Sequence, residues 1–511
     1  MSNVAKDCPR LSVAMIVRNA EDCLAASLDS VRNLADEIIV VDTGSHDSSL
    51  RIARQKATSV IPHAWTDDFS AARNAALGAV SGDWVLWLDA GETVSPQTAE
   101  ALRKFVDHEA NTNTAYFLLI RTPAQGANIA GEQVARVRLH PRTAGLTFSG
   151  RVRESLEASI AQLGMSTAGL SLVLERGPRE HDAAVRQERA QRNLRLASRA
   201  IETGAVTPRL LNCLGEAAQA LGQHAASLQH YRLALEQSSP GSSDMLEAYY
   251  GLLTALEGEE NSREQQLQLC MQAIDTYPLD AQLLCAIGGY LQSKDHIDLA
   301  SRAYQLSAEH GQLNLVIWHL DGLQEIATNC YASTLQLLGR EDDAIQLLND
   351  RLAEHPLWSR LRRQLIELHV RYARRDEALA VVNNTPRNVP NREALRSAVR
   401  GACLAAGGNW LAARSYLETA FKAGCRDAIC LRWLTATYLA AGDNDEASTM
   451  LEQWSRVDPL SPELRQYRQV LLSGTGNGRD RQLRVDEQRS GSIPAPALGG
   501  RAVQHDQTIG R

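Results

Sequence analysis

The sequence predicts an α/β domain followed by an all-α region of helical repeats. Two observations carry this prediction. Up to about residue 205, short apolar runs alternate with amphipathic segments, which is typical of βαβ units around a parallel sheet. Beyond that point the strand-like runs end, and small residues recur with a spacing near 34, which is typical of a helix-turn-helix repeat.

The elements expected in the first domain follow one another in a regular order. Each apolar run of strand length is followed by a segment whose apolar residues have helical spacing. The expected strands are 11–17, 36–42, 59–65 and 83–89, with helices at 20–34, 43–57 and 69–80 between them. Later apolar runs at 114–123, 133–142 and 170–175 add strands and indicate a mixed sheet.

The repeats are clearest in the second half of the chain. Spacings of 34, 35 and 34 residues separate four alanines, Ala344, Ala378, Ala413 and Ala447. A small residue at this place lets the paired helices approach closely, and Pro278 and Pro356 fall where a second helix should end. The pattern resembles the tetratricopeptide (TPR) repeat, with six to seven repeats in residues 206–472.

Composition narrows the class of protein. The chain has 511 residues and a formal net charge of −7, so nothing in it demands a nucleic-acid partner. Its nine cysteines include no CxxC pair, which argues against a disulfide framework and structural zinc and for a reducing compartment. There is no signal pattern and no transmembrane-length apolar run, so we expect a cytoplasmic protein. Residues 473–511 are rich in Gly, Ser, Arg, Gln and Asp and are expected to be a disordered tail.

Two of the expected strands end in an aspartate, Asp42 and Asp89. Ligands of an open parallel sheet bind at the carboxyl ends of its strands. The turn TGSHD after Asp42 precedes a helix, whose N-terminus favours anions, and the carboxylate can accept hydrogen bonds from the base or ribose of a nucleotide. A helix cap or turn residue is the alternative for Asp42, and this residue alone does not decide between them.

Four segments taken together resemble glycosyltransferase family 2. They are SVAMIVRNAEDCLAASLDSV, DEIIVVDTGSHDSS, WTDDFSAARNAAL and SGDWVLWLDAGE, and they cover residues 11 to about 182 with the segments that follow. The branch of the family to which they are most similar carries MIVKNEE, VVDTGSTD, DFSAARN and DWILWLDADE. The resemblance implies a GT-A fold, a nucleotide-activated sugar donor and inversion at the anomeric carbon. We therefore expect a GT-A domain at 1–205, TPR-like repeats at 206–472 and the tail at 473–511.

The end of the fourth strand departs from the family pattern. Family members neutralise the diphosphate leaving group with a divalent cation held by an Asp-x-Asp motif, and hard oxygen ligands suit Mn²⁺ or Mg²⁺. Asp89 matches the first aspartate, but Gly91 stands where the second would be. The resemblance thus implies a weakly held cation with Asp89 and Glu92 as ligands. The alternatives are a cation held by Asp89, water and phosphates, a weakened enzyme, or a glycine that only forms a tight turn.

Three further residues are expected at the donor. Arg73 in SAARN is implied to contact the donor phosphates, because a planar guanidinium binds phosphate oxygens in pairs; an ion pair on a helix surface is the alternative. Asp68 either orients the donor or caps the helix that it precedes. Glu21 matches the second acid of the family's KNEE, whereas Ala20 replaces the first, and the loop that holds Glu21 normally binds the base.

The acceptor side is expected to contain three other residues. Glu154 in GRVRES matches the glutamate of the family's GR[IV]HE motif and is the candidate base that takes the acceptor's proton. An ion pair is the alternative for Glu154, and Arg153 replaces the family's histidine. RLHPR resembles the family's RLFR strand, so Arg138 and Arg142 are expected to line the acceptor side.

Three functions remain open from the sequence. The first is an inverting, hexosyltransferase-type glycosyltransferase whose TPR repeats bind a protein or glycan acceptor or a partner protein. The second is a scaffold with a weakened or inactive transferase domain, favoured by the departures at Ala20, Gly91 and Arg153. The third is an enzyme of cell-surface polysaccharide or lipid-linked glycan synthesis. The first and third are favoured by five matching residues, Asp42, Arg73, Asn74, Asp89 and Glu92.

Overall fold

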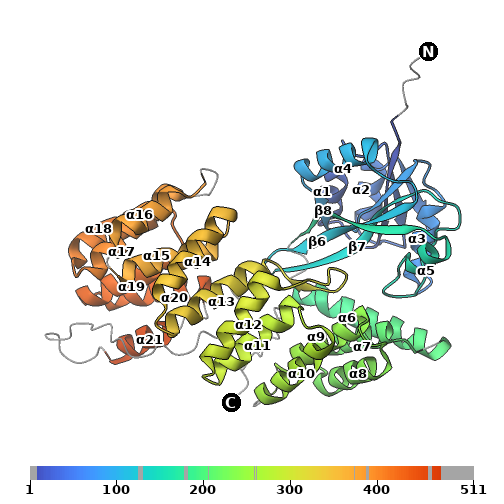
Figure 1. Ribbon diagram of the computed structural model, residues 1–511. Helices are drawn as coiled ribbons and strands as arrows, with labels where there is room; N and C mark the ends of the chain where they lie inside the picture. Colours follow the sequence, from blue (N-terminus) through green and yellow to red (C-terminus); the bar gives the residue numbers. More distant parts are fainter. Residues whose placement is uncertain are drawn as a thin grey trace, which may run out of the picture.

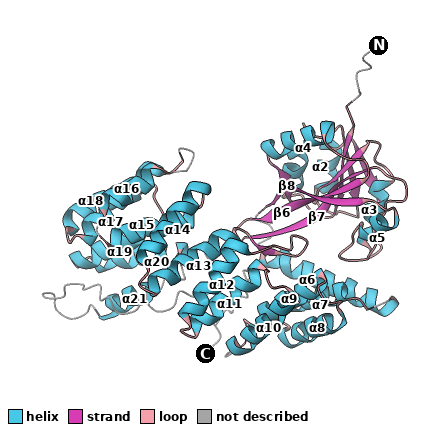
Figure 2. Cartoon of the chain, in the orientation of Figure 1, coloured by secondary structure: helices cyan, strands magenta, loops and turns pink. Residues whose placement is uncertain are grey.

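The computed structural model describes residues 8–124, 131–177, 182–204, 206–257, 259, 262–372, 374–386, 391–458 and 463–473. Within these residues an α/β domain is followed by an all-helical region, which confirms the fold class expected from the sequence (Figure 1, Figure 2). The expected disordered tail lies outside the described residues, apart from Ser473 at the end of the last helix. No helix in the described part of the chain is long and apolar enough to cross a membrane.

One mixed sheet forms the centre of the first domain. Its strand order is β3-β2-β1-β4-β7-β6-β8-β5, and β9 pairs with β7. β1 to β4 are parallel, whereas β7 runs antiparallel to β4. All seven strands expected from the sequence are present, and the short β5 and β9 are additional. The strands are β1 Leu11–Val17, β2 Glu37–Asp42, β3 Ser59–Pro62, β4 Trp84–Trp87, β5 Glu92–Val94, β6 Thr114–Thr122, β7 Glu132–Pro141, β8 Ser166–Arg176 and β9 His319–Leu320.

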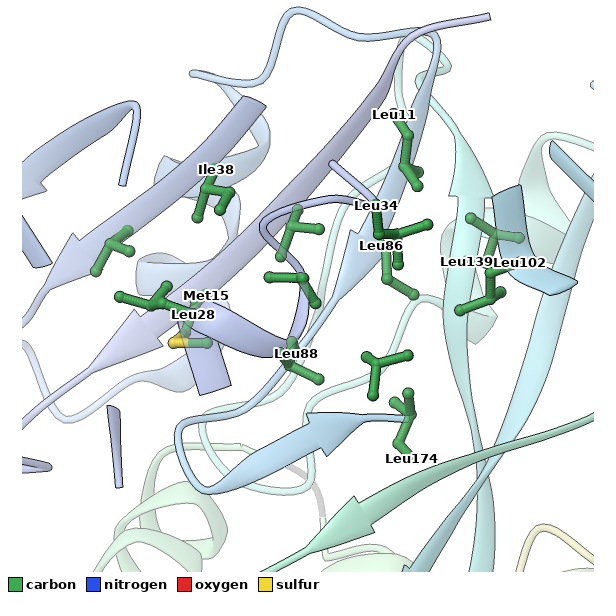
Figure 3. Packing of buried hydrophobic residues seen from close by; sticks show 14 of the residues in the cluster. Leu11, Met15, Leu28, Leu34, Ile38, Leu86, Leu88, Leu102, Leu139 and Leu174 are labelled. Atoms are coloured by element: carbon green, nitrogen blue, oxygen red, sulfur yellow. The ribbon is translucent and has the colours of Figure 1, made fainter. Parts of the chain in front are cut away.

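Helices cover both faces of this sheet. Alternate residues of β1 point to opposite faces: Met15 packs with α1 (Leu24–Ser30), α2 (Ser49–Lys56) and α4 (Pro96–His108), as Figure 3 shows in part. Ala14 packs instead with α3 and α5, which are Phe69–Leu77 and Glu157–Gln162. The two layers hold the sheet rigidly and leave the ends of its strands for other contacts.

The helical region is a solenoid of helix pairs that resembles a TPR array. After α6 (Ala183–Thr203), the described residues form seven antiparallel pairs and a last helix, α21 (Glu463–Ser473). The pairs are α7 Pro208–Ala220 with α8 His224–Gln237, α9 Ser243–Leu256 with α10 Arg263–Thr276, α11 Ala281–Ser293 with α12 Ile297–His310, α13 Leu323–Leu337 with α14 Glu341–Glu354, α15 Ser359–Arg371 with α16 Arg375–Asn383, α17 Arg392–Ala406 with α18 Trp410–Lys422, and α19 Ala428–Ala441 with α20 Asn444–Val457.

Small residues allow the helices of a pair to approach, as their spacing predicts. The four repeating alanines lie in the second helices of successive pairs and are fully buried. Glycines of the first helices have the matching role: a Cβ on Gly215 of α7 would lie 2.8 Å from the ring of Tyr231 of α8, and one on Gly288 of α11 would lie 2.7 Å from the ring of Tyr304 of α12. In these two pairs a glycine of the first helix leaves space that a tyrosine ring of the second helix fills.

The two regions share the sheet. β9 lies between α12 and α13 and pairs antiparallel with β7 at Glu132 and Gln133. The adjoining segment adds a backbone hydrogen bond from Ala135 to the carbonyl of Leu315, at 2.5 Å. The boundary near residue 205 thus separates two sequence patterns, but the helical region supplies a strand to the sheet of the first domain.

A second connection is an ion-pair cluster at Arg153. This residue, in the loop before α5, has a left-handed backbone (φ 52°) and bonds to Glu216 of α7 and to Glu247 of α9, the latter at 2.5 Å. The charges of the two glutamates outweigh desolvation and hold the pKa of Arg153 well above its usual value. The arginine that departs from the family motif therefore fastens that loop to two helices of the repeats.

We predict that Arg153→Ala loosens this junction. The side chains of Arg153 and Glu247 are only 17% and 14% exposed, so the substitution leaves a carboxylate poorly solvated and unpaired. We expect a loss of about 1–3 kcal/mol of stability, measured by urea unfolding. Arg340→Ala removes an exposed pair with Asp343 and is the control. An equal effect of the two substitutions would contradict the prediction.

Candidate functional site

The carboxyl ends of β1, β2 and β4 meet at one edge of the sheet. The parallel register places Val17 beside Asp42 and Ala14 beside Trp87. Asp42 ends β2, and Asp89 follows β4 by two residues. The two aspartates expected from the sequence therefore lie at the same edge.

Asp42 has one occupied and one free carboxylate oxygen. Its Oδ2 accepts hydrogen bonds from the backbone N–H groups of Gly44 and Ser45, each at 3.2 Å. Its Oδ1 is buried, and no partner for it exists among the described residues. An unpaired buried acceptor is costly, so this atom is suited to a donor group of a ligand at the strand end.

Glu21 is engaged in joining two loops. Its carboxylate accepts from the backbone N–H of Ser48 at 2.9 Å, and its own N–H donates to Asp47. The loop after β1 is thereby tied to the turn that precedes α2. Glu21 lies at the expected edge of the sheet, but through this bond its carboxylate supports the loop beside Asp42.

Asp89 lies between two arginines. Arg73 of α3 donates from Nη2 to Asp89 Oδ1 at 2.9 Å, and Arg138 of β7 donates from Nη2 to Asp89 Oδ2 at 2.6 Å. Burial alone would raise the pKa of Asp89, but the charges of Arg138 and Arg73 outweigh it and hold that pKa well below its usual value. Asp89 is therefore an anion at neutral pH and accepts from both guanidinium groups.

Arg73 joins Asp89 to the candidate base. Its Nε donates to Glu154 Oε1 at 2.7 Å, and its guanidinium lies over the rings of Trp87 and Phe148. Desolvation opposes the charge of Arg73, but Asp89 and Glu154 raise its pKa. A single side chain, that of Arg73, thus connects Glu154, which was expected on the acceptor side, with Asp89, which was expected at the donor.

Glu92 is turned inward, beneath Asp89. Its side chain is 2% exposed, and Oε1 accepts from Arg138 at 2.7 Å and from Arg176 Nε at 3.4 Å. Its Oε2 accepts from the backbone N–H of Asp89 at 3.1 Å. Burial, helped by the charge of Asp89, raises the pKa of Glu92 against the opposing charge of Arg138.

A β-bulge aims Arg138 at these carboxylates. The pairing of β6 with β7 passes from Tyr116–Leu139 to Phe117–Val137, so Arg138 is the extra residue on β7. Bulges commonly re-aim a side chain beside a functional site. The guanidinium of Arg138, which was expected on the acceptor side, therefore lies between Asp89 and Glu92.

The residues at the tip of β4 do not fit the expected metal site. Gly91 has φ +100°, which suits a glycine in a tight turn, and brings no ligand. Both oxygens of Asp89 and both oxygens of Glu92 are engaged, and the guanidinium of Arg138 lies where a cation shared by them would be. Among the described residues, no three or more His, Cys, Asp or Glu side chains are grouped to hold a metal ion.

Two other expectations change with the structure. Asp68 is the N-cap of α3 and its carboxylate accepts from the N–H of Ala71. Of the two roles expected for it, the structure shows the helix cap. Arg142 follows the end of β7 that lies beside the start of β4, and its Nε donates to the carbonyl of Gly82. Because β7 is antiparallel to β4, Arg142 lies at the opposite end of the sheet from Asp89, away from the other expected site residues.

A cleft of about 520 Å³ lies beside these residues and has walls from both regions. Arg73, Asp89, Arg138 and Glu154 line it from the first domain. The helical region contributes acidic and aromatic side chains, Glu216, Asp244, Glu247 and Trp318. The α/β domain alone would thus form only part of the cleft.

Sequence reasoning missed Arg176, Arg136 and the whole helical wall of the cleft. Arg176 is the last residue of β8, as Asp42 is of β2, and the same strand-end rule could have indicated it. The wall residues carry no such signal, because they lie on helices whose pattern reports only their packing.

Comparisons with known proteins agree with this architecture. Residues 12–139 match the family described as Glycosyl transferase family 2. The N-terminal region contains a family 2 glycosyltransferase domain. A TPR repeat-containing protein of Synechococcus elongatus is 36% identical over 128 residues, which cover 25% of this chain and 31% of that protein.

Other matches to the family 2 domain are similarly partial. An uncharacterized glycosyltransferase of Rickettsia typhi is 32% identical over 108 residues, which are 21% of this chain and 37% of the relative. The chain therefore spans about a third of the length of these relatives. A solved mannosyltransferase from Pyrobaculum calidifontis, in complex with GDP-Man and Mn²⁺, is 18% identical, covers 50% of this chain and 89% of that one, and has a TM-score of 0.29.

We predict that Gly91 is required by the backbone of the family 2 domain. A Cβ there would meet only Cys23 Sγ, at 3.6 Å, so the cost of Gly91→Ala comes from φ +100° and not from crowding. We expect a loss of about 1–2 kcal/mol, measured by thermal or urea unfolding. Gly78→Ala is the control, because its contacts are also at 3.6 Å and its φ is −70°. Equal stability of the two variants would contradict the prediction.

Proposed function

We propose that the chain is an inverting glycosyltransferase that uses a nucleoside-diphosphate sugar and holds its acceptor in the cleft between the two regions. The observation that carries this proposal is the connected series Glu154–Arg73–Asp89 at the strand ends. It places a candidate base next to residues that the family 2 resemblance assigns to the donor. The free buried oxygen of Asp42 supports a nucleotide at the same edge.

Glu154 is suited to act as the base. One of its oxygens is fixed by Arg73, and no described residue bonds to the other, while the side chain is only 12% exposed. In the transfer, an acceptor hydroxyl attacks the anomeric carbon from the face opposite the diphosphate. The C–O bond to the diphosphate breaks with its electron pair, and Glu154 takes the hydroxyl proton. Arg73 faces the departing charge.

The acceptor and the partners follow from the composite cleft. Carboxylates and an aromatic ring from the helical region line it, and such groups hydrogen-bond and stack with sugar rings or peptide side chains. We infer a glycan or protein acceptor that contacts both regions, with the remaining repeats open to a partner protein. A cytoplasmic location stays a prediction from the sequence.

The test of this function is donor turnover. Full-length protein is incubated with a panel of nucleotide sugars, with Mn²⁺ and separately with EDTA, and release of nucleoside diphosphate is measured. We expect Glu154→Gln to lower turnover by about 10²–10⁴-fold while nucleotide binding persists. Nucleotide binding without turnover of any donor would favour the scaffold alternative, and turnover that survives Glu154→Gln would remove the base assignment.

Asp42→Asn tests the nucleotide site separately. The asparagine oxygen can still accept from Gly44 and Ser45, but the free acceptor becomes an NH₂ donor. We expect affinity for the preferred nucleotide to fall about tenfold or more, measured by calorimetry. Asp83→Asn is the control, since Asp83 is an exposed carboxylate at the start of β4, bonded to the N–H of Arg10. Unchanged affinity in Asp42→Asn would show that the nucleotide does not use this oxygen.

A further inference from the structure

Arg136 differs from the other arginines that line the cleft. Each of the others forms an ion pair with a carboxylate of the protein: Arg73, Arg138, Arg153, Arg176 and Arg209. Arg136 donates from Nη1 only to backbone carbonyls, of Ala135 at 3.0 Å and of Val316 at 2.6 Å. No ion pair of Arg136 occurs in the part of the chain that the structure describes.

The surroundings of Arg136 favour a bound anion. Arg136 is exposed and lines the cleft, so its guanidinium is accessible to a ligand. An arginine stays charged at neutral pH, and no carboxylate of the described residues forms an ion pair with this one. A phosphoryl group would supply the missing counter-charge, and a guanidinium can bind two of its oxygens at once.

The position of Arg136 places this charge beside the donor site. It precedes Arg138 by two residues on β7, about 6–7 Å along the strand, and both line the cleft. Its bond to Val316 fixes it against the segment before β9. Arg136 therefore lines the same cleft as Asp89 and Glu154, next to the wall that the helical region supplies.

We propose that Arg136 binds the diphosphate of the donor and provides counter-charge that a divalent cation supplies in other family members. This rests on the proposed function. It accounts for three observations together: Gly91 brings no ligand, Glu92 is paired with arginines, and both oxygens of Asp89 accept from arginines. Positive charge on the leaving group then comes from a side chain of β7.

The test is calorimetry on the full-length protein with UDP and GDP, each in EDTA and in Mn²⁺, and with the corresponding nucleosides. We expect the preferred diphosphate to bind with affinities that differ less than about fivefold between the two conditions. Arg136→Ala should weaken that binding about tenfold and leave nucleoside binding unchanged, because only the phosphate contact is lost. The diphosphate affinity of Arg136→Lys should lie between that of the unaltered protein and that of Arg136→Ala.

Arg426→Ala is the matched control. Arg426 also donates to two backbone carbonyls, of Phe421 and Cys425, but lies in the repeats. Arg136→Ala leaves no protein carboxylate unpaired, so it should fold, which a thermal melt verifies. Binding that improves more than fivefold with Mn²⁺, or an Arg136→Ala variant that binds the diphosphate as tightly as the control, would overturn the proposal. Absence of any nucleotide binding in both conditions would instead remove the proposed function itself.

Discussion

The guanidinium of Arg138 holds the candidate site together. It lies between Asp89 and Glu92, which would otherwise be two carboxylates facing each other with little water. Removing one partner of such a buried ion pair leaves an unpaired charge in the interior, which costs far more free energy than replacing the whole group by apolar residues. The three side chains therefore depend on one another. The bulge in β7 places Arg138, and Arg138 in turn fixes the turn at Gly91 through Glu92 and the N–H of Asp89. The geometry of the strand ends is thus one electrostatic unit rather than a set of independent ligands.

Sequence reasoning recovered the elements and half of the site. Period and spacing predicted the seven main strands and the repeat alanines, because burial imposes those patterns locally. The strand-end rule located Asp42 and Asp89. It could not show that Glu92 pairs with Arg138 and Arg176, since these contacts join residues 46 and 84 positions apart with no spacing that reports them. The distance of Arg142 from Asp89 has a related reason: a motif on a strand does not report at which end of the sheet its residues lie.

The departure at Arg153 has a structural reason. Its charge is satisfied by glutamates on α7 and α9, so the residue belongs to the docking of the repeats on the family 2 domain. Its neighbour Glu154 faces the other way, to Arg73. Arg153 therefore contacts the helical region, and the next residue, Glu154, contacts the family 2 domain. A movement of α7 and α9 would be transmitted to the candidate base through the one peptide unit that joins the two residues. This explains why the loop differs from its family pattern at one position and keeps the next.

The short strand β9 also sets an order on synthesis. β7 carries Arg138, yet its outer part is paired with residues that follow it by nearly two hundred positions, after six helices of the solenoid. While the chain emerges from the ribosome, the part of β7 around Glu132 stays without its β9 partner until the segment around His319 has been synthesised. Long-range pairing of this kind slows folding and exposes a strand to wrong partners. The fold thus makes completion of its cleft a late event, which coincides with the arrival of the helices that form the other wall.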